Sequence, residues 1–454
     1  MYRIQRPVGR GEVMNRLWIG LGVLIWLVGS DSPARAQLDF EGPPVSYGKQ
    51  PTTDRVAQLA EALAGGELAL EEDAKFGLLP AVLNALDVPA DSQTLVFSKT
   101  SFQLHKISPG RPRALYFNDD TYVGWVQGSD IIELAAADKD QGAVFYTIEP
   151  NAAGEPRVLR DQGQCLICHA SSRTQGVPGF IVRSVYSTPA GRFVSGSPTY
   201  VTDHSSPFDE RWGGWYVTGT HGAMRHLGNV TCTDESRPGW IDPEQGDNLT
   251  ALPSRVRPAS YLTPDSDLVA LMVLEHQTQM HNWLTRASYE ARTAAYQDRG
   301  INEALDRPRD FESESTGRRI ASIGEKLVRY LLMADEFALS SPVSGTSDFS
   351  KTFSQRGPHD AEGRSLYQLD LNSRLFKYPC SFLIYSEQFD ALPDRVKRFV
   401  GQRLHTILLS DEAVKGYEQL SPEDRKAIAE ILGQTKSEFW NQYVKSPIPT
   451  RSAS

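Results

Sequence analysis

One stretch of the chain, residues 265–296, carries an uninterrupted helical pattern near the middle of the sequence. Between Leu268 and Leu274 its apolar residues lie nearly all round the helix axis instead of along one stripe. A helix of that kind is stable only when other elements cover it on every side, so we expect its first half to be buried. The rest of the chain must then supply the elements that cover it.

The sequence before this helix is typical of β-structure. After two helical patterns at 54–63 and 79–86, short apolar runs alternate with turn residues such as Asn118-Asp119-Asp120 and Gly128. This alternation predicts an antiparallel sheet. The expected strands are 94–97, 114–117, 122–126, 131–134 and 143–148, followed by strand-like runs at 179–186 and 192–201.

The second half of the chain has mainly helical patterns. Apolar spacings of three and four predict helices around 320–331 and 396–408, and a last helix from a capping Ser421 to about Tyr443. The polar, Ser-rich segment 340–365 predicts a loop. The sequence therefore predicts an α+β fold, with a β-rich region at 37–255 and a helical region at 256–454 packed on it as one unit.

The N-terminus has the pattern of an export signal. A short apolar run at 17–29 follows four arginines and precedes Ala34-Arg35-Ala36, a small-x-small cleavage pattern. The run is shorter than the roughly 20 residues that span a bilayer. We expect 1–36 to be a signal peptide, and the mature chain to be a soluble periplasmic protein with no transmembrane segment.

The charge of the chain limits its partners. The formal net charge is −9, and residues 1–36 hold five arginines against Glu12 and Asp31, so the remainder carries −12. A general nucleic-acid binder is excluded by that acidity. A partner with a basic docking surface is favoured instead.

Two of the four cysteines stand in the string Cys165-Leu166-Ile167-Cys168-His169. Two thiols at this spacing add across the vinyl groups of a haem, and the adjacent imidazole then lies at one axial face of the iron. A zinc site needs further soft ligands, and the chain has no second CxxC; the surroundings also lack a thioredoxin-like pattern. The motif predicts one covalent haem c, held by Cys165, Cys168 and His169.

With these five residues the chain resembles the c-type cytochromes. The small soluble members carry the motif near the start of a helical domain of roughly 100 residues, whereas here it follows a β-rich region. More broadly, the chain is similar to large single-haem periplasmic proteins known only as cytochrome c domain-containing. The segments that carry this likeness are Phe117-Asn118-Asp119, Gly124-Trp125-Val126, 211–222 and 375–380. The resemblance implies an exported, iron-containing haem protein and brings no substrate with it.

A six-coordinate electron carrier needs a second strong axial ligand, usually His or Met. His226 and His221 are the leading candidates, followed by Met224, because they lie in a glycine-rich loop that can approach the iron closely. His204 is a weaker candidate. The alternative is that these histidines bond to the backbone of a Trp-rich turn.

Other polar residues have two interpretations each. Arg211 and Arg225 either pair with haem propionates or are ordinary surface charges. Glu275, His276 and His281 interrupt the long apolar helix, and they either act as acid or base beside an open distal site or form a buried hydrogen-bonded group.

The remaining candidates carry less information. His105, His359 and His405 have no supporting neighbours and are expected to be structural. Cys232 and Cys380 form a disulfide in an oxidising compartment or are small buried residues, and the sequence leaves this open.

The expected function is electron transfer by an exported c-type cytochrome. The alternative is a haem oxidoreductase of the peroxidase or oxygenase type, or a haem-based sensor with an open distal site. The length of 454 residues favours these alternatives mildly, because a carrier needs far fewer.

Overall fold

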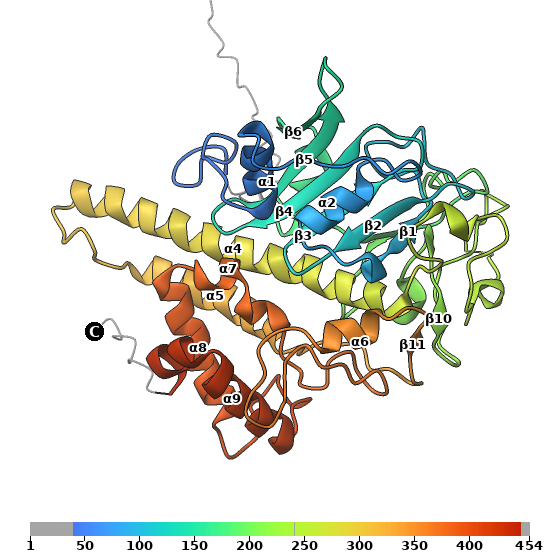
Figure 1. The fold of residues 1–454 in the computed structure, drawn as a ribbon. Helices are drawn as coiled ribbons and strands as arrows, with labels where there is room; N and C mark the ends of the chain where they lie inside the picture. Colours follow the sequence, from blue (N-terminus) through green and yellow to red (C-terminus); the bar gives the residue numbers. More distant parts are fainter. Residues whose placement is uncertain (1–39, 240, 446–454) are drawn as a thin grey trace, which may run out of the picture. The chain divides into compact units, whose positions relative to one another are not determined.

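The structure is a computed structural model that describes residues 40–239 and 241–445; the expected signal peptide at 1–36 lies outside them. By their contacts, the described residues form one unit. Within it the long helix α4 (Leu268–Ala304) lies between the sheet and the C-terminal helices (Figure 1).

The main sheet has seven strands in the order β6-β5-β4-β3-β2-β1-β9, and every neighbouring pair is antiparallel. The antiparallel sheet predicted from the sequence is therefore confirmed, with β6 and β9 as two strands that the pattern did not predict. The strands are β1 (Thr94–Val96), β2 (Arg113–Phe117), β3 (Thr121–Trp125), β4 (Ile132–Asp138), β5 (Gly142–Pro150), β6 (Pro156–Arg160) and β9 (Trp215–Tyr216).

The two faces of the sheet are covered differently. One face packs on α1 (Arg55–Ala64) and α2 (Leu79–Ala85), and its inward side chains, such as Tyr116 and Val123, are fully buried. The opposite face, with Tyr122 and Phe145, packs toward α4 and the cysteine motif. Because side chains alternate along a strand, these two sets belong to opposite sides of the same strands.

Helix α4 begins at Asp267, whose carboxylate accepts hydrogen bonds from Val269 N and Ala270 N. Every residue from Leu268 to Asn282 is buried. The expectation that the first half of this helix is buried is confirmed. The helix is longer than predicted and runs to Ala304.

The remaining chain is mainly helical, so the α+β class predicted from the sequence is confirmed. Its helices are α5 (Glu314–Leu331), α6 (Phe349–Ser354), α7 (Glu387–Asp390), α8 (Asp394–Leu408), α9 (Pro422–Thr435) and α10 (Ser437–Phe439). Two small two-stranded sheets and the motif helix complete the unit: β7 (Arg183–Val185) with β8 (Thr199–Val201), β10 (Gly219–Thr220) with β11 (Ser344–Gly345), and α3 (Leu166–His169).

Three local predictions were too simple. The segment predicted as a loop at 340–365 contains β11 and α6. The last helix ends at Thr435, because Lys436 leaves the helical conformation with φ −131°, and the chain then forms α10 and one π-helical turn. The strand-like runs at 179–186 and 192–201 shorten to β7 and β8, since the chain between them turns at Gly191 and Gly196, both with positive φ.

In the part of the chain that the structure describes, no helix is both long enough and apolar enough to cross a membrane.

Candidate functional site

The cysteine motif forms the one-turn helix α3, immediately after β6 at one end of the main sheet. The Asp161 carboxylate accepts hydrogen bonds from Gly163 N at 2.8 Å and Cys165 N at 3.0 Å, which fixes the turn between strand and helix. Cys165 is half-buried and Cys168 is exposed, and both are free thiols. The motif thus presents its two sulfurs on a short, anchored helix.

His169 is oriented by a backbone carbonyl. Its Nδ1 lies 2.9 Å from Gly179 O, and its ring packs against Phe145 with centroids 4.7 Å apart. Because a carbonyl only accepts, Nδ1 carries the proton and the lone pair is on Nε2. Burial lowers the pKa of His169, which favours the neutral ring. This is the tautomer that a metal-ligating imidazole requires.

Helix α4 holds the segment that carries this carbonyl. Asn282 accepts a hydrogen bond from Phe180 N and donates one to Phe180 O, each at 2.8 Å. A side chain at Gly179 would overlap the Asn282 amide. The orientation of His169 therefore depends on a buried side chain more than a hundred residues later in the sequence.

A charged pair that the sequence analysis missed lies beside the motif. Arg113 and Glu133 form an ion pair with 2.6 Å between nitrogen and oxygen, and the Arg113 guanidinium covers the backbone of Gly124. Burial raises the pKa of the Cys165 thiol to about 12, Asp161 contributes next, and the Glu133 and Arg113 charges act on it in opposite directions. The strand alternation places Arg113 and Glu133 on one face, but no sequence signal links that face to residue 165.

His221 and His226 are both buried, and with Asp247 they form a group whose possible ligand atoms all lie within 4.8 Å of one another. Asn248 N donates to His221 Nε2 at 3.1 Å, and Gly228 N donates to His226 Nδ1 at 2.9 Å. Each ring thus accepts a backbone hydrogen bond, as the alternative interpretation of the sequence had it. Burial lowers the pKa of both histidines, that of His226 to about 3.

This histidine pair lies far from the motif. The segment that leads to it contacts the start of α4, where Leu268 N donates to Thr218 O. Gly179, which orients His169, lies at Asn282, fourteen residues along the same helix. At a rise of 1.5 Å per residue, Leu268 and Asn282 are about 21 Å apart along the axis of α4. The structure does not bring His221, His226 or the neighbouring Met224 to His169.

The two arginines predicted for propionates are engaged elsewhere. Arg211 is buried and pairs with Glu275 at 3.2 Å, and it also donates to the carbonyls of His204 and Ser206. Arg225 lies 2.9 Å from the Asp247 carboxylate, in the histidine group.

The candidate histidines on α4 belong to two separate buried hydrogen-bonded groups. His276 Nδ1 lies 2.8 Å from His204 Nδ1, and its Nε2 lies 2.7 Å from Ser381 Oγ. His281 lies 2.6 Å from the Gln388 amide oxygen and 2.8 Å from Asp119 O. These groups are buried and hydrogen-bonded, as the second interpretation of the sequence anticipated.

Cys232 and Cys380 are also free and buried. The Cys232 Sγ lies 3.1 Å from Asp234 O, whereas Cys380 is packed in the main core. The structure therefore contains each of them as a separate buried thiol.

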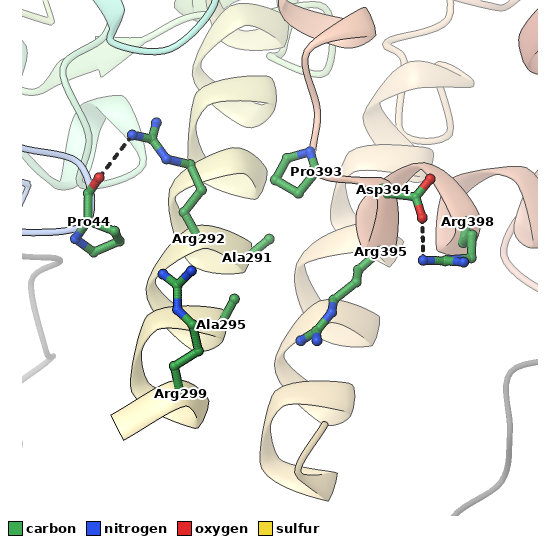
Figure 2. A pocket seen from close by; sticks show the side chains of 9 residues that line it. All are labelled: Pro44, Ala291, Arg292, Ala295, Arg299, Pro393, Asp394, Arg395 and Arg398. Carbon is green, nitrogen blue, oxygen red and sulfur yellow. Dashed lines mark hydrogen bonds and ion pairs between the residues drawn. The ribbon is translucent and has the colours of Figure 1, made fainter. Parts of the chain in front are cut away.

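One cavity of the described chain lies away from all of these residues. It has a volume of about 430 Å³ and lies between α4 and the start of α8 (Figure 2). Four arginines line it, and three are already paired: Arg292 donates to Pro44 O, Arg395 pairs with Glu312, and Arg398 pairs with Asp394. No candidate residue of the motif contributes to this cavity.

No family model, no curated protein and no solved structure matches this chain.

Proposed function

We propose that the chain is an exported c-type cytochrome that binds one haem through Cys165, Cys168 and His169 and transfers electrons. The observation that carries the proposal is the pairing of two free thiols at CxxCH spacing with an adjacent histidine whose Nδ1 is held by Gly179 O. A bound haem iron would supply a one-electron redox change.

The surroundings of the motif fit such a group. The sheet face beside α3 has two short, half-buried side chains, Ala135 and Thr147, next to the Arg113–Glu133 ion pair, whereas the opposite face is fully covered. A flat, mostly apolar ligand attached at Cys165 and Cys168 would cover this face. Phe145 would support the His169 ring from the sheet side.

The polar residues of the chain favour electron transfer over the enzyme alternative. Acid or base catalysis needs a side chain free to exchange a proton at the reacting group. Glu275, His276 and His281 are instead buried and bonded to Arg211, Ser381 and Gln388. In the described chain, none of these three is free to act beside the motif.

The acidity of the chain supports a redox partner with a basic docking surface, since complementary charges speed encounter. Export to the periplasm agrees with c-type attachment, which takes place outside the cytoplasm.

The test is attachment of haem in the full chain, produced in cells that mature c-type cytochromes. A denaturing gel stained for haem, with intact mass, will show one haem that Cys165→Ser and Cys168→Ser weaken and that the double variant abolishes. Cys232→Ser, another free cysteine, is the matched control and will keep the haem. Absence of covalent haem from the wild-type chain would overturn the proposal.

Electron transfer is then separated from catalysis by reversible titration of the purified protein with mediators. We expect one reversible one-electron step. Peroxide turnover well above that of free haem would instead support the enzyme alternative.

A further inference from the structure

A loop next to the cysteine motif exposes apolar side chains to solvent. In residues 99–106, Phe102 is 58% exposed and Leu104 is 39% exposed. Two more apolar residues are exposed near by: Ile167 is part of the motif, and Phe193 follows Gly191, whose carbonyl accepts a hydrogen bond from Lys99 N of the loop. Apolar groups gathered at one place on a surface usually mark a binding site.

The loop is anchored over the same sheet face as the motif. Gln103 donates to Glu133 Oε1 at 3.0 Å and contacts Ile131 O, and Lys106 donates to Gly128 O. Glu133 is on the same face of β4 as Ala135, which is paired in register with Phe145, the residue against which the His169 ring packs. One residue, Glu133, therefore connects the loop to the motif.

The part of the sheet between loop and motif is incompletely covered. Leu115, Glu133 and Ala135 are half-buried there, whereas the residues on the other face of the same strands, such as Ala114 and Leu134, are buried. The motif borders this area at Phe145, and the loop borders it at Glu133. A group attached to the motif over this area would lie between the motif and the loop.

The loop contains His105, which is exposed. The other candidate ligands in the described chain are occupied or elsewhere. The four methionines there are buried in the main core or its edge: Met224, Met272, Met280 and Met333.

Five further histidines are buried with polar or aromatic partners: His204, His221, His226, His276 and His281. His405 of α8 is bonded to Val444 O. His359 is next to Asp360, which pairs with Arg364 in the helical part of the chain. His281 also lies near, with its ring 5.5 Å from that of Phe180, but both of its ring nitrogens are bonded. His105 is the exposed histidine whose segment is bound to Glu133, on the sheet face against which His169 packs.

We infer that His105 is the second axial ligand of the haem, and that residues 99–106 form the distal cover, with Phe102 and Leu104 as its apolar surface. This inference rests on the proposed function. It replaces His226 and His221 in the distal role, and it takes the two ligands from segments 64 residues apart in the sequence.

The test uses the spin state of the purified holoprotein, read by absorption and electron paramagnetic resonance. We expect the wild-type protein to be low-spin and not to bind carbon monoxide when reduced. His105→Ala will become high-spin and bind carbon monoxide, and added imidazole will restore the low-spin spectrum. His359→Ala, another exposed histidine, is the matched control and will remain low-spin.

Two results would overturn the inference: a low-spin His105→Ala protein, or a wild-type protein that is already high-spin. Both are distinct from failure of the proposed function, because the haem stain shows covalent haem in either case. The spectrum of His226→Ala, run beside these, will match the wild type if His105 is the ligand.

A second measurement does not depend on substituting His105. Hydrogen exchange of backbone amides in 99–106 will be slower in the holoprotein than in the haem-free Cys165→Ser/Cys168→Ser chain. Equal exchange rates in this segment would contradict its role as a cover.

Discussion

The Nδ1 of His169 and the carbonyl oxygen of Gly179 lie 2.9 Å apart, and this contact links the cysteine motif to the long helix α4. Gly179 is in turn fixed by Asn282 of α4, which binds both backbone groups of Phe180. The imidazole orientation is therefore set by tertiary packing and not by the motif itself.

Asn282→Ala tests this link. It leaves the buried N–H and C=O of Phe180 without partners, so we expect the free energy of unfolding to fall by about 2 to 4 kcal/mol. In the holoprotein the midpoint potential will shift as well, because the ring of His169 loses its fixed orientation. Gly300→Ala, on the exposed end of the same helix, is the control and will change stability by no more than about 1 kcal/mol. An Asn282→Ala protein with unchanged stability and potential would refute the link.

The charges of Arg113 and Glu133 are expected to shift the midpoint potential of the haem in opposite directions. Arg113→Gln removes a positive charge, which stabilises the oxidised form and lowers the midpoint potential; Glu133→Gln raises it. Shifts on the order of tens of millivolts follow from Coulomb's law at an effective dielectric constant near 20. Potentiometric titration measures both. The double variant serves as the control and will lie near the wild type, and two shifts of the same sign would contradict the assignment.

Glu275 is expected to make stability depend on pH. Burial raises the pKa of this carboxyl to about 7, against the opposing effect of Arg211, from an ordinary value of 4.5. Between these values the folded chain keeps a proton that the unfolded chain has released, so stability falls as pH rises through this range and levels off above it. In Glu275→Gln this contribution is absent, and the curve will be flatter. Urea unfolding across the range measures it, with Glu71→Gln, an exposed site, as the control that should keep the wild-type slope.

The contact between α5 and α8 is expected to tolerate no added methyl group at Gly324. A Cβ there would overlap the ring of Phe399. Gly324→Ala will therefore lower the free energy of unfolding by about 1 to 3 kcal/mol, although alanine is the better helix former. Gly317→Ala in the same helix has room and will be neutral or stabilising. Thermal unfolding of the two variants compares them directly, and equal melting temperatures would count against this packing.

Local patterns were sufficient for most elements of the fold. Side-chain periodicity predicted the burial of Leu268 to Asn282 and the first five strands of the main sheet. This is possible because the spacing of apolar residues reflects which faces of a helix or strand are buried. The strands β6 and β9 escaped notice, since β6 is a half-exposed edge strand and β9 has only two residues. The chemistry of Cys165, Cys168 and His169 also rests on local spacing.

Only the tertiary structure decided which residues surround that motif. A glycine-rich loop favoured His221 and His226, yet they lie near the other end of the buried part of α4. Glu133 is instead on the sheet face against which His169 packs, and the loop with His105 is bound to Glu133. The physical reason is that spacing along one chain segment fixes short-range geometry, such as two thiols and an imidazole on one turn. Which distant segments share a sheet face depends on strand order and packing, and no pattern within a single segment contains that information.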